Sequence, residues 1–78
     1  MPYIKEAARA YIDNGNSPRS AGELTYIVYA AALHLLGRAP TFSDFAAVLG
    51  AIEAAKMEIY RRIIAPYEDM KVKENGDI

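Results

Sequence analysis

The stretch SAGELTYIVYAAALHLLG, residues 20–37, decides the fold class. Ser20 and Glu23 have the spacing of a capping box, in which the two side chains bond free amides of the first helical turn. Gly37 suits the position after a helix end, and Pro40 prevents the helix from resuming. Apolar residues recur between these limits at helical spacing. The stripe is formed by Leu24, Ile27, Val28, Ala31 and Leu35.

A longer helix is predicted over residues 43–65. Ser43 is a suitable N-cap, and Asp44 would favour the positive end of the helix. Pro66 would end the helix, because proline cannot continue one. Small residues in the middle would allow another helix to approach closely: Gly50, Ala51, Ala54 and Ala55. The main apolar stripe contains Phe45, Val48, Leu49, Ile52, Ile59 and Ile63.

The two ends of the chain carry weaker signals. Residues 1–13 show helical spacing of apolar side chains, and the run from Asn14 to Pro18 would stop a helix there. Residues 66–78 are predicted to be a polar C-terminal tail. The sequence therefore predicts an all-α fold, a small three-helix domain spanning residues 1–78 as one domain.

The length of the chain predicts a homo-oligomer. A domain of 78 residues buries only about 60% of its unfolded surface. The chain has no cysteine, so neither disulfides nor thiolate zinc sites can add stability. With 53% hydrophobic residues, a monomer would leave much apolar surface exposed, and we expect a dimer or tetramer.

Composition also narrows the function classes. The net charge of −1 gives no general attraction to long nucleic acids or anionic membranes. No segment reaches the roughly 18 apolar residues of a membrane span, and residues 1–5 do not resemble a signal peptide. We expect a cytoplasmic protein. His34 is the only histidine, so no metal site and no cofactor are expected, and no catalytic motif indicates an enzyme.

The C-terminal third carries the densest set of hydrogen-bonding groups. Arg61, Arg62 and Lys71 flank two tyrosines, Tyr60 and Tyr67. Arginine guanidinium groups match phosphate oxygens, and tyrosine rings can stack on bases. The pattern is typical of an anion-binding corner.

Tyr3, Lys5 and Arg9 could join the corner from the N-terminal segment. Alternatively, Glu58 lies three and four residues before the two arginines and could form ordinary helix-surface ion pairs with them. We expect one arginine to pair with Glu58 and the other to remain available.

Most of the chain also resembles a family of very short proteins of unknown function that bacteriophages, prophages and bacteria encode. The resemblance lies in residues 1–5 (MPYIK), 22–28 (GELTYIV), 50–53 (GAIE), 58–69 (EIYRRIIAPYED) and 71–77 (KVKENGD). Small phage proteins of this kind include nucleotide sponges of the anti-CBASS type. They oligomerise and sequester the cyclic oligonucleotide signals of bacterial immunity without hydrolysing them.

The resemblance implies a non-enzymatic sponge in the host cytoplasm, with a cyclic dinucleotide or a related phosphorylated molecule as its partner. The alternative is a small helical module for protein–protein interaction, in which the same C-terminal segment docks on another protein. The predicted ligand-binding residues are Tyr3, Lys5, Arg9, Tyr60, Arg61, Arg62, Tyr67, Lys71 and Asn75.

Overall fold

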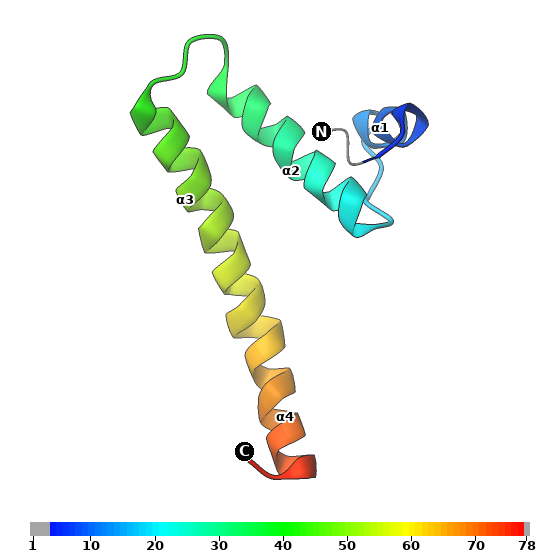
Figure 1. Ribbon diagram of the computed structural model, residues 1–78, viewed down its shortest axis with the longest axis vertical. Coiled ribbons are helices and arrows are strands. Elements are labelled where there is room, and N and C mark those ends of the chain that lie inside the picture. Colours follow the sequence, from blue (N-terminus) through cyan, green and yellow to red (C-terminus); the bar gives the residue numbers. More distant parts are fainter. Residues whose placement is uncertain (1–3, 78) are drawn as a thin grey trace. The chain divides into compact units, whose positions relative to one another are not determined.

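The computed structural model describes residues 4–77, which are helical apart from short connections (Figure 1). The helices are α1 (Glu6–Asp13), α2 (Ala21–Leu36), α3 (Phe42–Ile59), the π-helix η1 (Tyr60–Ile64) and α4 (Ala65–Asn75). Residues 4–77 contain no strand. The predicted all-α class is confirmed. The chain divides into two compact units, Met1–Phe45 and Ala46–Ile78.

The first unit is organised by contacts between α1 and α2. Ile12 is the buried apolar residue of α1. The Tyr26 hydroxyl of α2 donates to the Asp13 carboxylate at 2.9 Å. This bond raises the pKa of Tyr26 above its ordinary value. The two helices are thus joined by an apolar contact region and by the Tyr26–Asp13 hydrogen bond.

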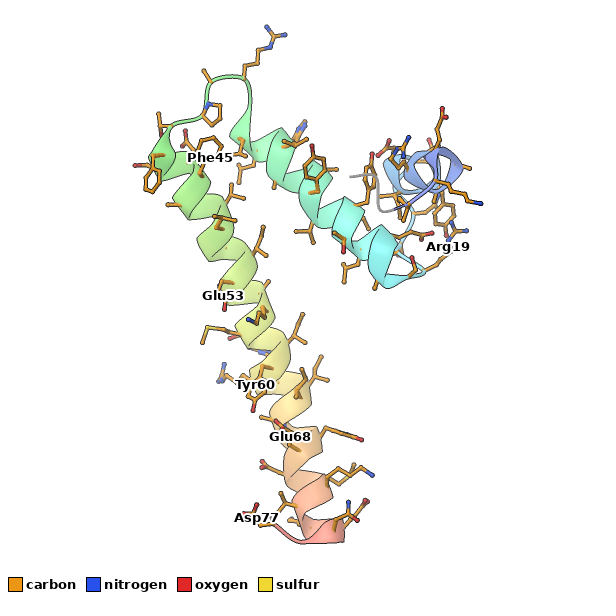
Figure 2. The ribbon with its side chains drawn as sticks, viewed as in Figure 1. Arg19, Phe45, Glu53, Tyr60, Glu68 and Asp77 are labelled. Carbon is orange, nitrogen blue, oxygen red and sulfur yellow. The ribbon has the colours of Figure 1, made fainter. Side chains whose placement is uncertain are left out.

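The predicted capping box at the start of α2 is confirmed in part. Ser20 Oγ accepts the Glu23 backbone N–H at 3.1 Å. The Glu23 carboxylate does not return to Ser20. It accepts the backbone N–H of Arg19 at 2.8 Å and also the Arg19 guanidinium at 2.9 Å. The same guanidinium lies 3.6 Å from the centre of the Tyr11 ring, so this cluster ties α1 to the start of α2 (Figure 2).

Two predicted boundaries need correction. The helix predicted over 1–13 begins at Glu6 among the described residues, because Lys5 has an extended backbone (φ −69°, ψ 160°). The helix predicted from Ser43 begins at Phe42. Its cap is Thr41, whose Oγ1 accepts the Asp44 backbone N–H at 3.3 Å while the Asp44 carboxylate accepts the Thr41 N–H at 2.8 Å. Gly37 caps α2 as predicted, with a φ of +71° that suits glycine.

The largest correction concerns the predicted tail. Residues 65–75 are the helix α4, and the ribbon runs from α3 through η1 into α4 without a break (Figure 1). The helix ends at Gly76, whose φ is +79°. Pro66 does not end the helix, because the π-helix η1 directly before it lets the chain accommodate the proline ring.

Replacing Thr41 by alanine tests the cap of α3. Thr41→Ala removes the acceptor for the Asp44 N–H, and we expect it to lower the free energy of unfolding by about 0.5–2 kcal/mol. Ser43→Ala is the matched control, since Ser43 already lies inside the helix, and it should change stability much less. Urea denaturation followed by circular dichroism measures both. Equal losses in the two variants would contradict the assignment of the cap.

Acidification tests the cluster that joins α1 to α2. The hydrogen bond from Arg19 lowers the pKa of Glu23 below its ordinary value of 4.5. The ion pair therefore stabilises the folded state above that pH, and the stabilisation is lost as the pH falls through the lowered pKa. Thermal melts between neutral and acidic pH should show a loss of stability in this range, and Glu23→Gln should reduce it. A pH dependence that is identical in both proteins would exclude this role.

Candidate functional site

The π-helix η1 contains three of the residues predicted to bind a ligand: Tyr60, Arg61 and Arg62. The Ala65 backbone N–H donates to the carbonyl of Tyr60, five residues back. A π turn holds one more residue than an α turn, and such turns are frequent at functional sites. This turn directly precedes Pro66, whose ring would clash with the carbonyl four residues back in a regular helix interior. The widened turn thus explains how the helix passes the proline.

A hydrogen bond between two side chains about two turns apart depends on the same π turn. The Tyr60 hydroxyl donates to the Glu68 carboxylate at 2.8 Å, eight residues further on (Figure 2). Eight residues of uninterrupted α-helix would place two side chains about 80° apart around the axis. The extra residue of the π turn removes roughly one residue's rotation, about 100°, and brings both side chains to one face. The bond raises the pKa of Tyr60.

Glu58 binds both arginines of the π turn. Its carboxylate oxygens lie 3.4 Å from the Arg61 guanidinium and 2.6 Å from the Arg62 guanidinium. The prediction that one arginine would remain available is wrong for this arrangement. The side chains of Arg61 and Arg62 are nevertheless 74% and 73% exposed. One carboxylate neutralises one of two positive charges, so the group formed by these three side chains is locally positive.

Three of the predicted ligand-binding residues lie in α4, namely Tyr67, Lys71 and Asn75. Lys71 forms an ion pair with Glu74 at 3.1 Å. Its ammonium nitrogen also lies 5.7 Å from the centre of the Tyr67 ring. Asn75 is the last residue of α4. Tyr67 lies about one turn and Lys71 about two turns after the π-helix. We call the segment from Glu58 to Lys71 the π-turn corner.

The N-terminal candidates belong to the other unit. Lys5 is exposed and precedes α1, whereas Arg9 is half-buried and donates to the carbonyl of Ile4 at 3.0 Å. Tyr3 lies outside the described residues. Sequence reasoning missed Glu68 as the partner of Tyr60, because a spacing of eight residues brings side chains together only across a π turn.

The charges of the C-terminal segment limit what it can bind. From Glu58 onward the sequence has four basic and five acidic residues. The segment therefore offers no broad positive patch of the kind that long nucleic acids require. Within residues 4–77 no group of three or more histidine or acidic side chains is arranged to hold a metal ion. No helix in the described part of the chain combines the length and apolar character that a membrane span needs.

One family model matches the chain, over residues 1–78. It describes a domain of unknown function, DUF6899. The chain belongs to the DUF6899 family. No curated protein and no solved structure matches the sequence. The family description assigns no activity, so a function can be inferred only from the residues.

Replacing Pro66 by alanine tests the origin of the π turn. Alanine restores the N–H and removes the ring, so Pro66→Ala should let a regular α-helix form and separate Tyr60 from Glu68. We expect the free energy of unfolding to rise, by at most about 3 kcal/mol. The pKa of Tyr60 should fall toward its ordinary value. Ultraviolet titration of tyrosinate measures this, with Tyr60→Phe identifying the signal of Tyr60 among the six tyrosines. An unchanged pKa would show that the proline does not set this geometry.

Proposed function

We propose that this protein is a non-enzymatic binding protein that captures a small phosphorylated ligand, a cyclic oligonucleotide, at the π-turn corner. The observation that carries the proposal is the pair of guanidinium groups held on one carboxylate, Glu58, at the π turn. Glu58 thus holds both arginines in a defined position before a ligand binds. Most of their side-chain surface remains accessible to a ligand. A cytoplasmic location belongs to the proposal, because a chain without cysteine suits a reducing compartment.

Breaking one of the ion pairs with Glu58 costs little free energy. Ion pairs between exposed side chains contribute about 0–1 kcal/mol each. A charge-assisted hydrogen bond from a guanidinium to phosphate contributes about 1.5–3 kcal/mol. A phosphate can therefore replace Glu58 on one arginine, while Glu58 keeps the other arginine in place.

Aromatic side chains supply the second part of such a site. Tyr67 is exposed, and Lys71 lies over its ring. Stacking of a base on an aromatic ring contributes about 1–3 kcal/mol and tolerates any base. The neutral balance of the segment favours a ligand with few phosphates over a long polyanion. This chemistry agrees with the sponge function that the sequence resemblance implies.

A protein-interaction module is the second candidate, and a different observation favours it. Met70 and Val72 are exposed on α4. Their apolar side chains cannot bind a phosphate. A docked protein would cover such side chains, whereas a bound nucleotide would leave them exposed. The two candidates differ in whether a nucleotide alone binds.

Calorimetry with cyclic dinucleotides and trinucleotides tests the first candidate. We expect the parent protein to bind one of them, and Arg61→Ala or Arg62→Ala to weaken binding about ten-fold or more, because a charge-assisted hydrogen bond is lost. Arg38→Ala is the matched control, since Arg38 is an exposed arginine of the other unit, and it should leave affinity unchanged. If the parent binds none of these nucleotides, or if both arginine variants bind as the parent does, the interaction module replaces the sponge.

A further inference from the structure

The chain contains two Asn-Gly pairs, Asn14-Gly15 and Asn75-Gly76. Each lies at the C-terminal end of a helix, the first directly after α1 and the second at the end of α4. Glycine has no side chain that could shield its backbone nitrogen, so in both pairs this nitrogen can reach the side chain of the preceding asparagine. The two pairs are chemically alike, and their structural surroundings distinguish them.

The reaction open to such a pair is deamidation, which needs only water. The glycine nitrogen loses its proton to the solvent and bonds to Cγ of the asparagine. The Cγ–Nδ2 bond breaks, ammonia leaves and a succinimide ring closes. Water then breaks one of the two ring bonds to the glycine nitrogen. The product is aspartate, or isoaspartate where the main chain now runs through Cγ. The sequence of steps can start only when the glycine N–H has left its hydrogen bond.

Bonds around the contact between α1 and α2 hold the first pair closed. The Gly15 N–H donates to the carbonyl of Ile12 at 2.9 Å, and Ile12 is buried. The carboxylate of Asp13 accepts the Tyr26 hydroxyl of α2 at 2.9 Å. On the other side of the pair, the side-chain amide of Asn16 donates to a carbonyl of α1 at 2.8 Å. Opening this turn therefore disturbs the bonds that join α1 to α2.

The second pair is held by the last turn of α4. The Gly76 N–H donates to the carbonyl of Val72 at 2.8 Å. Lys71 and Glu74 add an ion pair at 3.1 Å between exposed side chains, and such pairs contribute little to stability. Within its unit, α4 contacts η1, the element that directly precedes it. The ends of helices open at a small cost in free energy, so the nitrogen of Gly76 is released much more often than that of Gly15.

We propose that Asn75 is a site of spontaneous deamidation in the folded protein, and that the bonds joining α1 to α2 protect Asn14. The product carries one more negative charge than the parent, whose net charge is −1. This charge arises beside Glu74, at the C-terminal end of α4, which is the negative end of the helix dipole. Deamidation therefore loosens the last turn of α4. The proposal does not depend on the ligand proposed above, because the reaction involves no ligand.

Peptide mapping by mass spectrometry tests the proposal on the full chain, incubated in mildly alkaline buffer. Asn75 should deamidate about ten-fold or more faster than Asn14, because a helix end opens more easily than a turn tied to a second helix. In concentrated urea the two rates should become similar, since the fold that protects Asn14 is lost. Equal rates in the folded protein, or a difference of the same size in urea, would overturn the proposal.

Isoelectric focusing of the same samples provides a second measurement with matched variants. The parent should acquire a more acidic form during incubation. Asn75→Gln should prevent it, and Asn14→Gln, the matched control, should not. An acidic form that Asn75→Gln leaves unchanged would overturn the assignment to Asn75.

Hydrogen exchange in the last turn of α4 tests the consequence of the reaction. Asn75→Asp carries the charge of the product, and Asn75→Gln is the neutral control. The amides of residues 73–76 should exchange about two- to five-fold faster in Asn75→Asp, because the charge opposes the helix dipole. Equal exchange in the two variants would overturn the proposed loosening. Failure of nucleotide binding in calorimetry would leave all of these results unaffected, so the two proposals can fail separately.

Discussion

The shortage of buried apolar surface is the constraint on which the rest of this structure depends. Ile12 and Val48 are the buried hydrophobic residues of the described chain, and a core of this size cannot offset the entropy of ordering about 70 residues. The helices are well defined locally by their caps at Ser20 and Thr41. Each unit therefore needs further apolar contacts, with the other unit or with another chain, to be stable.

The π turn links α3 to the polar C-terminal end of the chain. It lets the helix continue past Pro66 and holds Tyr60 on Glu68. As a result, Arg61 and Arg62 are carried on a rigid helix and share one carboxylate. A ligand site on such a helix would be positioned by the π turn and by the helices on either side of it.

The sequence predicted the features that depend on neighbouring residues. The cap at Ser20, the end of α2 at Gly37 and the all-α class are confirmed, because each follows from local spacing. The predicted tail was wrong, since a proline is a local stop signal and the π turn that accommodates it depends on the helix on both sides. The bond between Tyr60 and Glu68 was missed for the same reason.

Hydrogen exchange measured at several protein concentrations tests most directly the prediction that copies of this chain assemble with one another. Amides that open only by dissociation of an interface become more protected as concentration rises. The account predicts that protection of residues 46–59 increases with concentration, well beyond any increase in the exposed N-terminal helix α1. Protection of residues 46–59 that is strong and independent of concentration would contradict it, because the chain would then bury this segment by itself.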